Sequence, residues 1–145
     1  MRDRFKVWTP VSVRWGDMDA YGHVNNAVFF TYFECGRIAY FERLGIKDRS
    51  ESNPVAPALA SATINFRQQL HFPAELEVGI RVTKIGRSSF GFEHILVRTG
   101  TEDVIADGTS VIVYVDYRMG KSTPIPDHLR DLIRMVEGEE FEAGG

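Results

Sequence analysis

The stretch NNAVFFTYFECGRIAYFERLG, residues 25–45, decides the fold because it is too apolar for an ordinary surface helix. Its apolar side chains cover most of a helical wheel, which predicts a helix over residues 27–44 that other parts of the chain enclose. Asn25 or Asn26 can cap the start of this helix, and Gly45 can end it. The apolar positions are Val28, Phe29, Phe30, Tyr32, Phe33, Cys35, Ile38, Ala39, Tyr40, Phe41 and Leu44.

The segments on both sides of this helix predict strands. Alternation with period two runs from Phe5 to Trp15, with Phe5, Val7, Thr9, Val11, Val13 and Trp15 on one face. Four more strands are expected downstream, because similar alternation is interrupted there by turn residues. They are Ala58–Leu70 (with Ala60, Ala62, Ile64 and Phe66 on one face), residues 75–83, Ser89–Arg98 and Val104–Tyr117.

The expected order, a strand, a buried helix and then four antiparallel strands, predicts an α+β fold. A sheet of this kind covers its helix on one side only and leaves edge strands, which dimerisation can extend or close. A single domain is expected over residues 1–136, and it includes a short helix at about Asp127–Val136. The acidic, glycine-containing tail from Glu137 to Gly145 is expected to be disordered.

Composition excludes several classes of protein. The 145 residues include 43% hydrophobic residues and carry a net charge of -3, which fits one domain with its own core and argues against nucleic-acid binding. No apolar run approaches the roughly 18 residues of a spanning helix, and the N-terminus does not read as a signal peptide. The one cysteine, Cys35, is expected to be a buried apolar residue and fits a cytoplasmic location.

Motifs for other chemistries are missing from the sequence. The histidines at positions 23, 71, 94 and 128 lack the spacing of metal ligands, so no metal site is expected. No Gly-x-Ser-x-Gly elbow and no glycine-rich phosphate loop occurs either. Neither a serine hydrolase nor a nucleotide-binding protein is therefore expected.

Reactive side chains concentrate in RWGDMDAYGHVNN, residues 14–26, between the first strand and the helix. Asp17 and Asp19 place two carboxylates on a short loop beside a helix N-terminus, which offers unpaired backbone N–H groups and the positive end of the helix dipole. A carboxylate can attack a thioester carbonyl or activate a water molecule, and helix-end N–H groups can stabilise the oxyanion that develops. This combination is typical of acyl transfer.

The run Asp17-x-Asp19-x-x-Gly22-His23-Val24-Asn25-Asn26, followed on the helix by Tyr32-Phe33-Glu34 and Arg37, resembles the 4-hydroxybenzoyl-CoA thioesterase family. The resemblance extends over about Phe5 to Tyr117. It implies the hot-dog fold, a five-stranded antiparallel sheet wrapped around one long central helix. It also implies hydrolysis of acyl-CoA without a cofactor, in homodimers that can pair into tetramers.

The resemblance assigns roles to individual residues. Asp19 corresponds to the catalytic acid, and the backbone N–H of Asn26 to the group that polarises the thioester carbonyl. Gly22 would shape the turn, and His23 and Asn25 would serve mainly in positioning and capping. A second group of hot-dog thioesterases carries its acid on the helix, where this chain has Glu34.

Each assignment has a simpler alternative. Asp17 is expected to be structural, pairing with Arg14 or bonding loop amides, and Glu34 could form a helix-surface ion pair with Arg37. The sequence around His23 departs from hydroxybenzoyl-specific enzymes and is closer to broad acyl-CoA thioesterases and plant acyl-carrier-protein thioesterases. Coenzyme A phosphates need cations or hydroxyls, and the candidates are Arg67, Lys84, Arg87, Ser88 and Arg118, each of which could also be ordinary surface polarity.

Two other functions remain open on the sequence. A hot-dog hydratase also acts on acyl thioesters, but its motif places the Asp and His differently from Asp19 and His23. A dimeric module that binds acyl-CoA without catalysis would need no reactive carboxylate.

Overall fold

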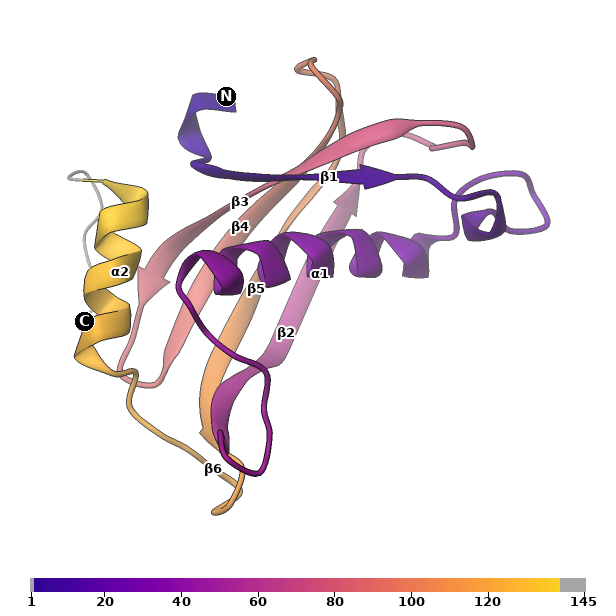
Figure 1. Cartoon of the computed structure of the whole chain (residues 1–145). Coiled ribbons are helices and arrows are strands. Elements are labelled where there is room, and N and C mark those ends of the chain that lie inside the picture. The colour runs from indigo at the N-terminus through magenta and orange to yellow at the C-terminus, as the bar shows by residue number, and fades with distance from the viewer. Residues whose placement is uncertain (1, 139–145) are drawn as a thin grey trace.

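The computed structural model describes residues 2–138 and shows a curled antiparallel sheet that covers one side of a long helix (Figure 1). The order across the sheet is β1-β3-β4-β5-β2, with the short β6 paired to β5. This confirms the predicted α+β fold. The elements are β1 Val7–Ser12, α1 Asn26–Arg43, β2 Val55–Phe66, β3 Glu75–Ile85, β4 Ser89–Arg98, β5 Val104–Asp116, β6 Lys121–Ser122 and α2 Asp127–Glu137, with 3₁₀ turns at Arg2–Arg4 and Trp15–Asp17.

The first strand is shorter than predicted. Val7 and Val11 face the core as expected, but Phe5 packs with Ile95 and Val97 on the opposite face of the sheet. Trp15 is 73% exposed because the chain leaves β1 and enters the second 3₁₀ turn. Alternation of residue types therefore extended beyond the hydrogen-bonded strand at both ends.

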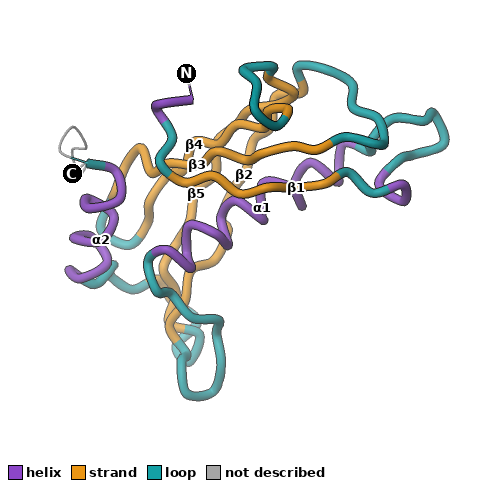
Figure 2. Tube along the Cα trace, turned by 45° about the horizontal axis from the view of Figure 1, so that its top comes forward, coloured by secondary structure: helices purple, strands orange, loops and turns teal. Residues whose placement is uncertain are grey.

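Helix α1 packs closely onto the concave face of the sheet, and Figure 2 shows it running alongside β1. Gly36 allows this approach, because a Cβ atom at Gly36 would lie 2.6 Å from Cγ1 of Val78 on β3. The buried face of the helix presents Phe29, Tyr32, Phe33, Gly36, Arg37 and Tyr40. A close helix-to-sheet contact of this kind gives each buried aromatic ring neighbours on most sides.

The other face of α1 is not enclosed, so the predicted all-round burial is wrong for a single chain. Phe30 is 41% exposed, Ile38 is 48% exposed, and Cys35 is exposed rather than buried. The physical reason is that the sheet covers only one side of the helix. Leu59 and Phe66 on the edge strand β2 are also largely exposed, so apolar surface continues from α1 to the open edge of the sheet.

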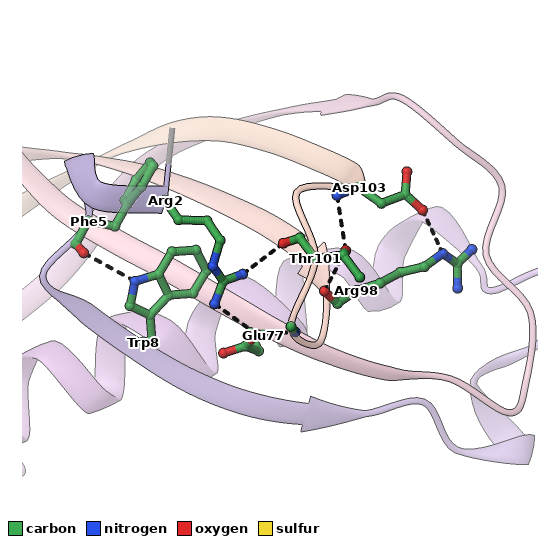
Figure 3. Close-up of polar contacts among 8 residues, drawn as sticks. Arg2, Phe5, Trp8, Glu77, Arg98, Thr101 and Asp103 are labelled. Carbon is green, nitrogen blue, oxygen red and sulfur yellow. Dashed lines mark hydrogen bonds and ion pairs between the residues drawn. The ribbon is translucent and has the colours of Figure 1, made fainter.

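The N-terminal segment is fixed on the convex face of the sheet (Figure 3). The guanidinium of Arg2 lies 4.2 Å from the centre of the Trp8 ring and donates to Glu77 and to the carbonyl of Thr101 at 3.0 Å each. The indole N–H of Trp8 donates to the carbonyl of Phe5 at 3.1 Å. These contacts hold β1 as the sheet edge opposite β2.

Helix α2 lies at the end of the sheet where α1 ends, far from the loop that precedes α1 (Figure 1). Its last residue, Glu137, accepts hydrogen bonds from the hydroxyl of Tyr40 and from the backbone N–H of Val82, the second at 3.0 Å. Burial and this bond raise the pKa of Tyr40. The helix thus extends one residue beyond the predicted domain end, and the rest of the predicted tail, from residue 139 on, lies outside the described residues.

Candidate active site

Asp17 anchors the loop between β1 and α1. Its carboxylate is 2% exposed and accepts from the backbone N–H of Arg14 at 2.9 Å, from the Arg14 guanidinium at 2.9 Å and from the hydroxyl of Tyr32 at 2.7 Å. Its backbone carbonyl accepts from the N–H of Asn25 at 3.0 Å. The predicted structural role and the pairing with Arg14 are confirmed, and Tyr32 ties the loop directly to α1.

These bonds set the charge of Asp17. Burial by itself raises the pKa of this carboxyl, but the hydrogen bonds from Arg14 and Tyr32 outweigh burial and hold the pKa below its usual value. Burial and the bond to Asp17 also raise the pKa of Tyr32, so the phenol remains a donor. Asp17 is therefore ionised and engaged by three donors, so Asp19 is the only one of the two loop carboxylates that is left as a candidate for reaction.

Replacing Asp17 with Asn should lower the free energy of unfolding by about 2 kcal/mol at pH 7, because charge-assisted hydrogen bonds in a buried site are lost. The pKa of Asp17 is lower in the folded chain than in the unfolded one, so this stabilisation is complete above roughly pH 4 and is lost at lower pH. Urea unfolding of both proteins at pH 7 and pH 3 measures the difference. Tyr32→Phe should cost only about 1 kcal/mol, and equal stability of wild type and Asp17→Asn at pH 7 would contradict this role.

Asp19 lies on a tight turn that returns the chain to the helix. Its N–H donates to the carbonyl of His23 at 2.8 Å, and its carbonyl accepts from the N–H of Gly22 at 3.0 Å. Gly22 has a φ of 79°, a conformation that glycine adopts without strain, as expected for the residue that shapes the turn. One carboxylate oxygen of Asp19 accepts from the N–H of Tyr21 at 2.9 Å, and the side chain is exposed in the single chain.

The start of α1 presents a free backbone donor. Asn25 is the N-cap, as predicted, and its side chain accepts from the N–H of Ala27 at 2.9 Å. Asn26 is the first helical residue, and within residues 2–138 its N–H has no acceptor. The first N–H groups of a helix are directed out of its N-terminal end, where the dipole is positive.

Asp19 and Asn26 line one pocket of about 410 Å³. His23 also lines it, Phe29 and Phe66 supply apolar walls, and the two rings meet edge to face with centroids 5.1 Å apart. The pocket is therefore lined by a residue with a carboxylate, a residue with an unpaired backbone N–H and two apolar rings.

The predicted coenzyme A residues separate into three places. Arg67 lines the same pocket as Asp19, with its guanidinium paired to Asp107 at 3.0 Å. Lys84, Arg87 and Ser88 lie at the β3–β4 turn, next to α2 and at the far end of the sheet from Asp19 of the same chain. Arg118 pairs locally with Asp116 at 3.0 Å. One chain alone brings Arg67 together with Asp19, but not the residues of the β3–β4 turn or Arg118.

Glu34 lies at a different pocket, of about 420 Å³, between α1 and the first half of β2. Arg37 lines the same pocket but is only 5% exposed, and burial lowers its pKa while Glu34 opposes that effect. No Glu34–Arg37 ion pair occurs among the described residues, so the simple surface pair considered for Glu34 is not formed. Ile38 and Leu59 give this pocket apolar walls.

Three side chains near the loop and helix have contacts that the sequence did not reveal. Tyr32 bonds Asp17, and the ring of His71 packs against that of His23. His94, on β4, lies under Phe33 with ring centroids 4.3 Å apart, and neither ring nitrogen has a partner within residues 2–138. Burial, followed by the charge of Arg37, lowers the pKa of His94 to about 4.

The family of the chain follows from comparison with known proteins. Residues 13–133 match the thioesterase-like superfamily. The chain belongs to the thioesterase-like superfamily. Among curated members, protein YsmA of Bacillus subtilis is 30% identical over 129 residues, covering 89% of this chain and 86% of that protein. The chloroplastic acyl-acyl carrier protein thioesterase ATL3 of Arabidopsis thaliana is 26% identical, and the matched region covers 83% of this chain and 63% of that protein.

Solved structures of this superfamily have the same architecture. A Thermus thermophilus thioesterase complexed with coenzyme A and Zn is 34% identical, with a TM-score of 0.83 over 96% of this chain and 99% of the other. The hot-dog fold is thereby confirmed, and the superfamily supports thioester hydrolysis as the reaction. In the part of the chain that is described, no helix is long and apolar enough to span a membrane.

Proposed function

We propose that this protein hydrolyses acyl-CoA thioesters to a carboxylic acid and coenzyme A, with Asp19 as the reacting carboxylate. The observation that supports this most strongly is the shared pocket, which is lined by Asp19 and by Asn26, whose N–H has no acceptor within residues 2–138. Phe29 and Phe66 provide an apolar wall for part of the acyl chain. Membership of the thioesterase-like superfamily is consistent with this chemistry.

The proposed reaction uses few groups. The thioester carbonyl oxygen accepts from the N–H of Asn26, which stabilises the negative charge that develops on that oxygen. Asp19 either takes a proton from the attacking water or attacks the carbonyl carbon itself to form a mixed anhydride. In both routes the C–S bond breaks and the thiolate of coenzyme A takes up a proton. In the second route a water molecule then cleaves the anhydride, which releases the carboxylic acid and regenerates Asp19. Incorporation of labelled oxygen into Asp19 during one turnover separates the two routes.

A second copy of the chain would complete the site. The strand β2 is an open edge of the sheet, and the exposed apolar side chains Phe30, Ile38, Leu59 and Phe66 lie on α1 and β2, so pairing of two β2 strands offers a way to cover them. Antiparallel pairing would place the first half of β2 in one chain beside the second half in its partner. The pocket at Glu34 of one protomer would then adjoin the pocket at Asp19 of the other. Further pairing of dimers into tetramers stays a prediction.

The same arrangement offers a role for the distant polar residues. Ser89 pairs with Val113, and Val113 pairs with Ala58, so the turn with Lys84, Arg87 and Ser88 lies two strands from the first half of β2. In the proposed dimer, three strand spacings of roughly 4.8 Å separate β4 from the partner's β2 strand. The turn therefore lies about 15 Å from that strand. Its cations could therefore hold the phosphates of a coenzyme A molecule whose thioester reaches the partner's Asp19 pocket.

The substrate class is tested by thiol release from a panel of acyl-CoAs with short, long and aromatic acyl groups. We expect hydrolysis well above the buffer rate for at least one member of the panel. Acyl-carrier-protein substrates form the second arm, because ATL3 is named as an acyl-acyl carrier protein thioesterase. Hydrolysis of acyl-carrier-protein substrates alone would show that the carrier protein, and not coenzyme A, carries the natural acyl group. Binding of acyl-CoA without thiol release in either arm would indicate a non-catalytic acyl-CoA module. Cytoplasmic location stays a prediction from the sequence.

A further inference from the structure

His71 holds the turn that carries Asp19 from a different part of the chain. It lies between β2 and β3, and its Nδ1 atom is 2.9 Å from the carbonyl oxygen of Gly22. Its ring meets the ring of His23 edge to face, with centroids 4.7 Å apart and an angle of 68° between the planes. His71 thus touches both residues that close the turn opposite Asp19.

The chemistry of this contact determines the tautomer of His71. A carbonyl oxygen can only accept, so Nδ1 of His71 must carry the proton and donate it. In the neutral ring, Nε2 is then the unprotonated nitrogen.

Apart from the His71 segment, the turn is held by bonds within the loop, among them the bond from the N–H of Tyr21 to the Asp19 carboxylate and the bridge between Met18 and Val24. Asp19 and His23 are joined by one backbone hydrogen bond, and Asp19 and Gly22 by another, so a shift of Gly22 or His23 moves Asp19 as well. Tyr21 at the tip is 87% exposed. The only other tie from this turn to the His71 segment, within the described residues, is the bond from the N–H of Val24 to the carbonyl of Leu70 at 2.7 Å.

We propose that His71 is a positioning residue that fixes Asp19 and His23 in the pocket through its hydrogen bond to Gly22. His23 lines the pocket, whereas His71 lies behind it and acts through the turn. This inference rests on the proposed function, because it assigns His71 to the same reaction. A displacement of about 1 Å at a reacting group can cost on the order of 100-fold in rate, so one such support can have a large kinetic effect.

Two substitutions separate the hydrogen bond from the ring contact. His71→Asn keeps an amide N–H near the position of Nδ1 but loses the ring, whereas His71→Phe keeps a ring against His23 but loses the donor. We expect His71→Phe to lower kcat for acyl-CoA by about 10- to 100-fold with KM nearly unchanged, and His71→Asn to restore kcat to within about threefold of wild type. The melting temperatures of both variants should stay close to wild type, because the side chain is exposed.

The outcomes distinguish this inference from the proposed function. Equal kcat for His71→Phe and wild type, or equal losses of kcat in both variants, would overturn the positioning role. Nitrogen NMR of the wild type should show the Nδ1–H tautomer of His71, and an Nε2–H tautomer would overturn the hydrogen bond itself. A wild type that hydrolyses no thioester while showing the Nδ1–H tautomer would refute the function and the catalytic role together, leaving only the contact.

Discussion

Replacing Asp19 with Asn should lower kcat for acyl-CoA hydrolysis by about 10²–10⁴-fold, the usual contribution of a positioned acid or base. Asn has nearly the same shape and can still accept the hydrogen bond from the N–H of Tyr21, so the turn should keep its conformation. The decrease in kcat would then be caused by the missing carboxylate and not by a change in folding. Thiol release at saturating substrate measures kcat, and thermal unfolding checks the fold.

Glu34→Gln is the matched control for Asp19→Asn, because it neutralises the other candidate acid by the same chemical change. Glu34 lines a different pocket from Asp19 in the single chain, and we expect its variant to lower kcat by less than about tenfold. The reverse pattern, with Asp19→Asn active and Glu34→Gln inactive, would move the reaction to the helix acid.

Placing a lysine at Ser61 should convert the proposed dimer into monomers and lower activity at least about tenfold. Ser61 lies near the middle of the edge strand β2 and is exposed in the single chain, so the lysine costs little there. In an antiparallel pair of β2 strands the two lysines would meet close to the twofold axis, where like charges directly opposite each other destabilise pairing. Light scattering gives the molar mass, and thiol release gives the activity of the same samples.

Met135→Lys is the control for added positive charge. Met135 is exposed on the second half of α2, a helix that packs against β3, and this variant should stay dimeric and fully active. A monomeric Ser61→Lys protein with wild-type activity would show that one chain holds a complete site. A wild-type protein that is itself monomeric would refute the proposed dimer.

The sequence predicted most of the fold because one long apolar segment left few alternatives. β4, Ser89–Arg98, has the predicted bounds, since turn residues flank it on both sides. β2 is shifted toward the N-terminus and carries an irregularity between Leu59 and Ser61, so Ala62, Ile64 and Phe66 keep the predicted face while Ala60 falls at the irregular position. The alternation of residue types alone could not locate that irregularity.

The sequence predicts that α1 is buried on nearly every side, and this prediction is wrong for a single chain for a physical reason. The apolar character of Phe30 and Ile38 predicts that both side chains are buried. It does not indicate whether the same chain or a second copy buries them. The single chain leaves both exposed. The apolar pattern of α1 therefore fits a subunit interface as well as it fits enclosure within one subunit.

The sequence predicts only those parts of the candidate site that are formed by residues close together in the chain. Asp17, Asp19, Gly22, His23 and Asn26 are close in sequence, and the structure places them around one turn and one helix end. Contacts from distant segments, such as those of Tyr32 with Asp17 and of His71 with Gly22, depend on how the elements pack. No local pattern in the sequence indicates them.

The central claim is that the thioester carbonyl is held at the start of α1 beside Asp19. The most direct measurement is a crystal structure with an acyl-CoA analogue in which a methylene group replaces the thioester sulfur. We expect the carbonyl oxygen about 3 Å from the backbone nitrogen of Asn26, with the Asp19 carboxylate facing the carbonyl carbon. A carbonyl bound instead beside Glu34, with Asp19 remote from it, would contradict the account.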